Sequence, residues 1–420
     1  MNPLPLLHET TIGHVPVRLS HLPSGLVLDP NLALVFGSSG LSGQVVYTAT
    51  GTLFEARATR TPSGDYLLMF PTNTPEQPTG SAHYNQQGRG HSKINRMLAF
   101  RSKDRGATWE GPVVPFDPAY NQHAFIPLIP RGGKRIYAFG TQPIGELCPR
   151  DHGQQENAPI GYRYSDDDGY QWSEVRLIHP VNDPGFAGMS AMRMCELDTG
   201  TWLLGSHEAD WSFQPIMTRQ YVLRSPDQGK TWSALPNRRH GGWCVPQFNR
   251  MDEGRPISLG GCRALIMIRT CEGHLWISRT EDDGLTWSHP EPTPLVHPDA
   301  PPMLFHLSDG KTLAALHHNR HHDLNYGGLD GSHPGNRDRS EIWVSLSDDE
   351  GRTWSAPRFV FATVAEPNLE ADWSNWQCSY LDAFADEGIL NLFVPHRWQR
   401  CLHLSIREDA LHSLPESLTP

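Results

Sequence analysis

Histidines gather in a few short polar segments of this chain. A histidine suits both halves of acid/base chemistry because its ordinary pKa, about 6.5, lets it take up or release a proton near neutral pH. The polar, Gly-rich segment SAHYNQQGRGH holds His83 and His91, which we take as candidate catalytic residues. Three further histidines are candidates for substrate binding: His123 in NQHAFIP, His207 in SHEADW and His318 in HHNRHHD.

Arginines next to apolar runs could bind a substrate carboxylate, a role distinct from the acid/base role of the histidines. A guanidinium presents its N–H groups as a planar fork that matches a carboxylate in two hydrogen bonds. Glu253 and Arg255 flank a glycine at the start of one such run, and Arg193 has the corresponding place in the run before it. We expect these side chains to face a pocket, with salt bridges between neighbouring sheets as the alternative.

A repeated turn shows which elements must position these residues. The pattern S-x-D-x-G-x-x-W, with Thr once in place of Ser, recurs roughly every 55 to 67 residues, about the length of a four-stranded sheet. Asp and Ser side chains bind nearby backbone amides, Gly allows a positive φ, and Trp buries its ring against the sheet. The copies are SKDRGATW (102–109), SDDDGYQW (165–172), SPDQGKTW (225–232), TEDDGLTW (280–287) and SDDEGRTW (347–354).

Strand-like runs separated by Gly, Pro, Asp and Asn turns, with no long helical period, predict an all-β chain. We expect a single domain over residues 1–420, a six-bladed β-propeller with these turns, or alternatively a seven-bladed one. Residues 1–50 would either close the ring or form part of an additional blade; closure removes exposed sheet edges. The innermost strands are predicted to begin near Phe54, His123, Met189, Glu253, Pro302 and Ser379.

The charge of the chain limits its partners. A formal net charge of -11 without a Lys/Arg run disfavours nucleic acid and an anionic membrane, but an acidic sugar needs only a few arginines in a pocket. The start of the chain lacks a basic segment followed by an apolar one, and no 18-residue apolar stretch occurs. We expect a soluble, cytoplasmic protein, or a secreted one if a leader has been removed.

The seven cysteines show no C-x-x-C spacing, which favours free thiols over disulfides or a zinc site. We therefore expect no cofactor. A structural Ca²⁺ or Zn²⁺ ion is the alternative, although the sequence offers no spaced ligand motif for either ion. Five tryptophans outside the repeated turns could stack on sugar faces or fill the core: Trp211, Trp243, Trp373, Trp376 and Trp398.

The repeated turns resemble the Asp boxes of the sialidase superfamily, from about Phe54 to Asp409. In that family an Arg triad holds the substrate carboxylate, a Glu activates a nucleophilic Tyr, and an Asp is the acid/base. The segment DEGRPISLGGCRALIMIRT resembles the family's Glu and second Arg, and the arginine before SEIWVSLSDDEG resembles the third. The resemblance therefore implies a nucleophile at Tyr380, its activator at Glu253, and substrate-binding arginines at Arg269 and Arg339.

Two departures from the family pattern weaken a sialidase assignment. Phe54, Glu55 and Ala56 stand where the family has Arg-Ile-Pro, and the segment before the first Asp box offers His91 in place of the acid/base Asp. These changes look like those propellers of the superfamily that act on rhamnose linked α-1,4 to glucuronate with a pocket histidine.

Three functions follow from these resemblances, in order of preference. The first is an enzyme that cleaves a terminal glycosidic linkage in an acidic oligosaccharide or polysaccharide by β-elimination at glucuronate. Such a reaction needs a base, an acid and a cation beside the carboxylate. The second is an exo-acting glycoside hydrolase, like a sialidase or a rhamnosidase. The third is a propeller that binds glycans without catalysis.

The residue that decides between these mechanisms is His91. If His91 donates a proton to the departing oxygen, His91→Ala should lower kcat by roughly 10²-fold or more, the usual scale of general acid/base catalysis. Thermal stability should hardly change, because the segment around it is polar and Gly-rich. Activity near that of the wild type in a folded His91→Ala protein would move the role to His83, His123 or His207.

Overall fold

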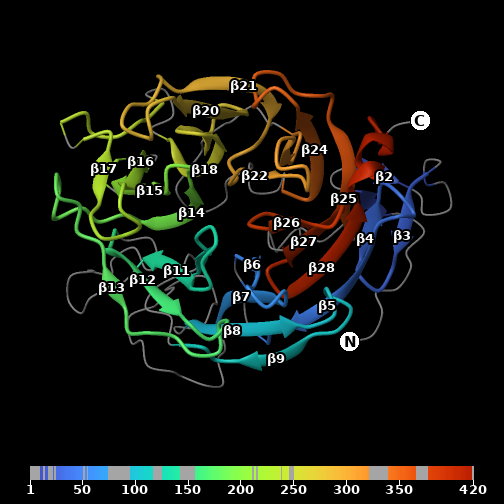
Figure 1. Cartoon of the computed structure of the whole chain (residues 1–420). Helices are drawn as coiled ribbons and strands as arrows, with labels where there is room; N and C mark the ends of the chain where they lie inside the picture. The colour runs from blue at the N-terminus through green and yellow to red at the C-terminus, as the bar shows by residue number, and fades with distance from the viewer. Residues whose placement is uncertain are drawn as a thin grey trace. The chain divides into compact units, whose positions relative to one another are not determined.

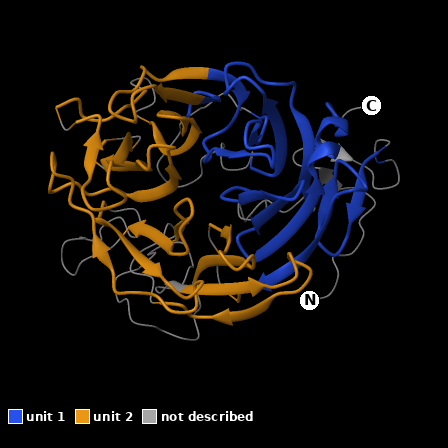
Figure 2. Cartoon of the chain, viewed as in Figure 1, with its two compact units in different colours: residues 1–48, 271–275, 293–420 blue, residues 49–270, 276–292 orange. Residues whose placement is uncertain are grey.

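The structure, a computed structural model, describes residues 10–12, 15–17, 22, 25–50, 53, 55–73, 95–116, 125–141, 157–210, 212–213, 216–237, 239–245, 250–320, 339–365 and 377–418. Within these ranges the regular secondary structure is almost wholly β-strand, with one short 3-10 helix, η5 (Glu408–Ser413). It divides into two compact units (Figure 2). Unit 1 comprises residues 1–48, 271–275 and 293–420, and unit 2 comprises residues 49–270 and 276–292.

Four four-stranded antiparallel sheets are built mainly from unit 2. The first contains β6 (Arg57–Arg60), β7 (Tyr66–Asn73), β8 (Asn95–Ser102) and β9 (Glu110–Val113). The second contains β10 (Ile126–Leu128), β11 (Ile136–Thr141), β12 (Ile160–Ser165) and β13 (Arg176–Leu177). The third contains β14 (Ser190–Glu196), β15 (Trp202–Asp210), β16 (Met217–Ser225) and β17 (Ser233–Leu235). The fourth contains β18 (Asp252–Gly260), β19 (Arg263–Arg269), β20 (His274–Thr280) and β21 (Glu291–Val296).

Unit 1 forms two further sheets, and the N-terminal strands join both of them. The fifth sheet contains β22 (Met303–His306), β23 (Leu313–His317), β24 (Glu341–Ser347) and β25 (Arg358–Ala365). It is extended at β25 by β1 (Thr10–Ile12) with β2 (Val15–Val17) and by β4 (Leu34–Phe36) with β3 (Val27–Asp29). The sixth sheet contains β26 (Asp382–Asp386), β27 (Ile389–His396), β28 (Arg400–Arg407) and β5 (Ser42–Thr48), which lies antiparallel to β28 (Figure 1).

These six sheets are the blades of a six-bladed β-propeller, as predicted, and the described residues form no seventh blade. We number the blades 1 to 6 in the order just given. Every predicted innermost strand begins close to its expected residue; β18 begins at Asp252, one residue before Glu253, and β22 begins at Met303, one residue after Pro302. The extent of the single domain stays a prediction.

The Asp boxes form the turns between the third and fourth strands of blades 1 to 5. In the box of blade 3, the Ser225 hydroxyl donates to Asp227 Oδ1 at 2.9 Å and accepts the Gly229 amide at 2.7 Å. The Thr231 amide donates to Asp227 Oδ1 at 2.8 Å, and the Trp232 indole donates to the Gly229 carbonyl at 3.1 Å. The Ser, Asp and Trp side chains of the motif therefore all form hydrogen bonds within the turn, as the sequence predicts.

The residue before the box glycine also ties some blades to the blade before. Asp283, in the box of blade 4, accepts hydrogen bonds from the hydroxyls of Thr199 and Thr201 and from Arg224 Nη2, all in blade 3. Burial alone would raise the pKa of Asp283, but these donors outweigh it and lower the pKa. Asp168 plays the same part in blade 2, where it accepts from Thr61 and Arg101 of blade 1.

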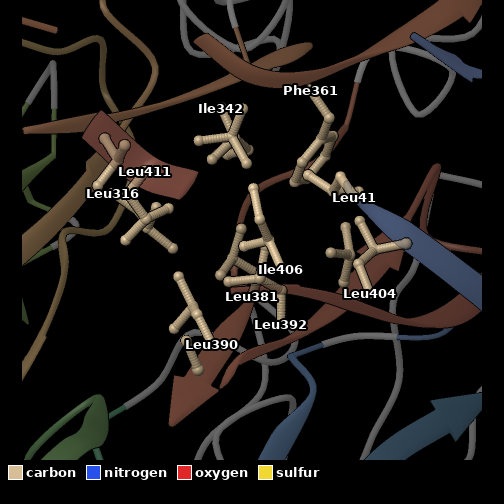
Figure 3. Close-up of a cluster of buried hydrophobic side chains, with 14 of the residues drawn as sticks. Leu41, Leu316, Ile342, Phe361, Leu381, Leu390, Leu392, Leu404, Ile406 and Leu411 are labelled. Carbon is tan, nitrogen blue, oxygen red and sulfur yellow. The ribbon is translucent and has the colours of Figure 1, made fainter. Parts of the chain in front are cut away.

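The apolar core of unit 1 lies between blades 5 and 6. Leu316 and Ile342 come from blade 5, while Leu390 and Leu404 come from blade 6, and Figure 3 shows these side chains gathered in one cluster. All four have no exposed surface. Burial of each such side chain is worth about 1.5–3 kcal/mol, so the contact area between neighbouring blades is a main source of stability.

Asp283→Ala should lower the free energy of unfolding by about 1–3 kcal/mol, because it leaves buried donors of blade 3 without their acceptor. The stabilisation depends on the charged carboxylate, whose pKa is lowered in the folded protein. It should be complete above the pKa of the unfolded Asp and disappear as the pH falls through the lowered value. Urea unfolding at several pH values measures both effects.

A matched control is Asp166→Ala, which removes an exposed ion pair with Arg135 from the second position of the Asp box in blade 2. This pair is screened by solvent, so its loss should change stability far less. Equal losses in the two variants would contradict the role given to Asp283.

Candidate functional site

A β-bulge shapes the start of the innermost strand of blade 4. Asp252 pairs with Arg269 and Arg255 pairs with Met267, so β18 contains one residue more than β19 over this stretch. Glu253 lies in the bulge with a positive φ of 50°. Such a backbone conformation costs free energy for a residue other than glycine, and bulges commonly redirect a side chain next to a functional site.

The bulge places two buried carboxylates against arginines. Arg269 Nη1 donates to Glu253 Oε2 at 2.5 Å, and Arg269 Nε lies 3.5 Å from Asp252 Oδ1. Arg250 Nε lies 2.9 Å from the other oxygen of Asp252. We call Arg250, Asp252, Glu253 and Arg269 the Glu253 cluster. The structure thus brings together Glu253 and Arg269, two of the residues that the resemblance singles out.

His207 touches the Glu253 cluster through the backbone. The Glu253 amide donates to His207 Nδ1 at 3.3 Å, and the Ser190 hydroxyl lies 3.0 Å from the same nitrogen. Because a backbone amide can only donate, Nδ1 must carry the lone pair, and the proton of the neutral ring is on Nε2. His207, a predicted substrate-binding residue, lies within β15, the second strand of blade 3, and is fully buried.

The other two arginine candidates of unit 2 lie on innermost strands, as predicted. Arg255 is fully buried on β18, and Arg193 is half-buried on β14. A second bulge, between Ala191 and Arg193, occurs in β14 at the place that matches the bulge of blade 4. The sequence gives no sign of either bulge.

In blade 1 a buried ion pair lies close to the position of the family's first arginine. Glu55 is buried with a positive φ of 26°, two residues before β6, and Arg57 donates from Nη2 to its carboxylate. Arg57 Nη1 donates to the Ala56 carbonyl at 3.0 Å. Arg57 is therefore bound to a neighbouring carboxylate, which makes it a poor ligand for a substrate carboxylate.

In unit 1, Arg339 and Tyr380 lie together. Arg339 Nη2 donates to the Asp299 carbonyl, and Nη1 lies 3.4 Å from the Ser379 hydroxyl. The guanidinium carbon lies 5.8 Å from the centre of the Tyr380 ring. Arg339 and Tyr380 are both buried, and we call these four residues the Arg339 cluster.

Tyr380 has an unusual backbone. Its φ is 62°, and it lies just before β26, the innermost strand of blade 6. Its ring packs edge-on against Trp398, with 6.4 Å between the ring centres. Trp398 is buried, and Trp243 lies in the core with its ring centre 6.2 Å from that of Trp287, so these two tryptophans fill the core. Trp211, Trp373 and Trp376, the other three that were predicted to stack on sugars or fill the core, lie outside the described residues.

His318 belongs to a buried group of three histidines, with His317 of β23 and with His297, which directly follows β21. β23 ends at His317, and His318 directly follows the strand. Burial lowers the pKa of His317 to about 4 and that of His318 to about 3; for His318 the charge of Arg339 adds to the effect. Burial also lowers the pKa of His297, which stacks on His318 with 5.1 Å between ring centres. All three rings are therefore neutral near pH 7.

Several buried polar residues of these clusters were not predicted. Asp252 directly precedes Glu253, and that adjacency was the only signal for it. Glu341 accepts hydrogen bonds from Arg320 at 2.6 Å and from the Trp343 indole at 3.0 Å. His297 and Asp299 lie in a Pro-rich segment that carries no functional motif.

Three predicted residues, His83, His91 and His123, lie outside the described residues, so their roles stay predictions. The proposed activation of Tyr380 by Glu253 joins residues of the two units and likewise stays a prediction. In the described part of the chain, no group of three or more His, Cys, Asp or Glu side chains is arranged to hold a metal ion. The same part contains six free cysteines and no helix long and apolar enough to cross a membrane.

Comparison with known proteins decides the family. The profile of the BNR repeat-like domain matches residues 147–392, more than half of the chain. The chain belongs to the BNR repeat-like domain family. No curated protein matches this BNR propeller significantly.

Solved structures similar to this BNR propeller include sialidases. A protein of unknown function from Dyadobacter fermentans has a TM-score of 0.60 and 16% identity over 88% of this chain and 100% of its own. The Hadza microbial sialidase Hz136 has a TM-score of 0.60 and 17% identity over 88% of this chain and 69% of its own. The NanB sialidase of Streptococcus pneumoniae has a TM-score of 0.58 and 10% identity over 87% of this chain and 71% of its own. The predicted sialidase-like superfamily is confirmed, while the rhamnose-glucuronate branch is not.

The Glu253 cluster of this BNR propeller can be tested by removing one charge. Arg269→Met should lower the free energy of unfolding by about 3–5 kcal/mol, because it leaves buried carboxylates uncompensated. Glu253→Gln in the same protein should restore part of that loss. Denaturant unfolding of the two single variants and the double variant measures the coupling.

Arg263→Met is a matched control, since Arg263 is half-buried on the same strand and donates to the Leu259 carbonyl. It should cost less than Arg269→Met. Strictly additive effects of the Arg269 and Glu253 substitutions would show that the two side chains do not stabilise each other.

Proposed function

We propose that this BNR propeller is a glycoside hydrolase that releases a terminal sugar from an acidic glycan. The observation that carries the proposal is the pairing of Arg339 with Tyr380, a buried guanidinium beside a buried phenol at the start of an innermost strand. Arginine is suited to bind a carboxylate through two hydrogen bonds, and tyrosine is one of the side chains that form covalent intermediates with sugars.

The backbone at Tyr380 supports a functional role for this residue. A φ of 62° is strained for a bulky side chain, and such strain persists where the surrounding structure holds a residue in a required position. The Arg339 guanidinium is held by the Asp299 carbonyl and the Ser379 hydroxyl, so its orientation is set before a ligand arrives. A charge whose orientation is fixed before the substrate binds is the most effective in stabilising a transition state.

In the proposed reaction the Tyr380 oxygen attacks the anomeric carbon as the bond to the leaving group breaks. The leaving oxygen takes a proton from a general acid, for which His91 is the candidate, and the phenol proton passes to a base, the role that the resemblance assigns to Glu253. Water then breaks the bond between Tyr380 and the sugar, so the configuration is retained.

Elimination at glucuronate, which the sequence favours, gains no support from the sialidases among the similar structures. The two reactions differ in their products, because elimination alone creates an unsaturated uronate that absorbs in the ultraviolet. A panel of aryl sialosides, aryl glucuronides, aryl rhamnosides and gum arabic separates them. Sugar release without the ultraviolet signal supports hydrolysis, and the signal itself would overturn it.

Tyr380→Phe tests the nucleophile. It should abolish release of the sugar from whichever aryl glycoside of the panel the wild type hydrolyses, because the attacking oxygen is lost, while the melting temperature stays close to that of the wild type. Tyr221→Phe is the matched control, since Tyr221 is also buried but packs against Phe186 in blade 3. Full activity in Tyr380→Phe would reject Tyr380 as the nucleophile. No turnover of any glycan by the wild type would remove the proposed hydrolase and favour a binding propeller.

A further inference from the structure

His318 is held in one position by contacts on several sides. It directly follows β23, and the next residue, Asn319, has a positive φ of 49°, so the chain turns away from the strand there. The His318 amide donates to His297 Nδ1 at 3.2 Å, and its ring stacks on the His297 ring. Its Nδ1 lies 2.7 Å from the Glu341 carbonyl oxygen. The side chain has no exposed surface.

These contacts determine where the proton of His318 lies. A carbonyl oxygen only accepts hydrogen bonds, so the proton of the neutral ring must be on Nδ1, and Nε2 presents a lone pair. This nitrogen has no hydrogen-bond partner among the residues that the structure describes. A buried acceptor left without a donor is costly and rare in folded proteins, which indicates that a donor from outside the described residues belongs there.

The two neighbouring histidines differ in this respect. His297 Nε2 lies 3.0 Å from the Ala300 carbonyl, and its Nδ1 accepts the His318 amide. His317 uses Nδ1 for the Val296 carbonyl and Nε2 for the Ser345 hydroxyl, both at 3.1 Å. Both ring nitrogens of His297 and of His317 are therefore occupied. Of the three rings, the His318 ring alone offers an open acceptor in the described structure.

The open acceptor lies in the same small region as Arg339. The Arg339 guanidinium donates to the carbonyl of Asp299, while His297, on which His318 stacks, contacts the carbonyl of the next residue, Ala300. The Glu341 carbonyl that holds His318 is two residues from Arg339 along the chain. Arg339 is also near enough for its charge to act on the His318 ring. The Arg339 guanidinium and the Nε2 acceptor of His318 are thus held in place by the same segments of the chain.

This combination restricts what can bind. The positive charge of Arg339 disfavours a metal ion or an ammonium group at Nε2, because like charges in a buried region repel strongly. The lone pair on Nε2 also repels a ligand group that can only accept hydrogen bonds. A neutral O–H donor fits the nitrogen, and an anionic group fits the guanidinium.

We propose that His318 is a specificity-determining residue that accepts a hydrogen bond at Nε2 from a hydroxyl of a sugar acid whose carboxylate binds Arg339. The inference rests on the acidic ligand of the proposed function, but it does not depend on hydrolysis. A sugar acid that lacks the matching hydroxyl would leave Nε2 unsatisfied and should bind about tenfold to a hundredfold more weakly.

Titration calorimetry with D-glucuronate, N-acetylneuraminate and their monodeoxy analogues tests the proposal. The variant is His318→Asn, because the Asn amide can still donate to the Glu341 carbonyl while the acceptor at Nε2 is removed. The wild type should discriminate against one deoxy analogue of the sugar acid it binds, and His318→Asn should lose that discrimination while keeping discrimination at the other hydroxyls. The discrimination of the wild type against this deoxy analogue should not vary between pH 5 and 8, because the His318 ring is neutral throughout, with its pKa lowered to about 3.

His317→Asn is the matched control, because both nitrogens of its ring already have protein partners. It should discriminate as the wild type does. Unchanged discrimination in His318→Asn would overturn the proposal, and so would binding of neither sugar acid by the wild type.

A crystal structure of the wild type with the bound sugar acid gives a second test that does not depend on the folding of a variant. A ligand hydroxyl within hydrogen-bond distance of Nε2 supports the proposal, and a water molecule there with no ligand contact overturns it. Discrimination through His318 without any turnover would reject only the hydrolase. Turnover with unchanged discrimination would reject only the role of His318.

Discussion

Polar side chains that are buried at the ends of inner strands must find partners inside the protein, because water does not reach them. This constraint explains much of what is unusual in the structure. Glu253 and Glu55 each adopt a left-handed backbone. Glu253 contacts Arg269 across one strand pair, and Glu55 contacts Arg57, two residues further along the chain. Glu341 is likewise surrounded by donors. The strained backbones and the bulge of β18 place these carboxylates next to their arginines.

The Asp boxes solve a different problem, that of turning the chain between the third and fourth strands of blades 1 to 5 while the amides of the turn keep hydrogen-bond partners. A box satisfies its own amides with the side chains of one Ser or Thr and one Asp, so it needs little from the rest of the molecule. Because the turn is self-contained, the residue before its glycine is left to contact another blade. Asp168 and Asp283 use that position to hold two pairs of neighbouring blades together.

The fold could be predicted because its signals are local and repeated. A box shows where the third strand of a blade ends, and the spacing of the boxes then predicts the inner strands to within a few residues. Glu253 and Arg269 were singled out by a resemblance, and the contact that the structure shows between them lies across one strand pair. The bulges, the position of His207 within β15 and the burial of Trp398 depend on register and on packing between distant segments, so a single sequence carried no signal for them. Neither could it reveal which nitrogen of His318 carries the proton.

Blade 6 combines strands from opposite ends of the chain, since Thr48 of β5 pairs with Arg400 of β28. During synthesis on the ribosome, β5 emerges early and has to wait for nearly the whole chain before its partner exists. Pairings over such long sequence separations are slow to form, and a strand that waits exposes its backbone groups to other molecules. The first three residues of β5, SGQ, have no large apolar side chain, but Val45, Val46 and Tyr47 follow them, so the waiting strand exposes apolar surface in its second half until β28 is made.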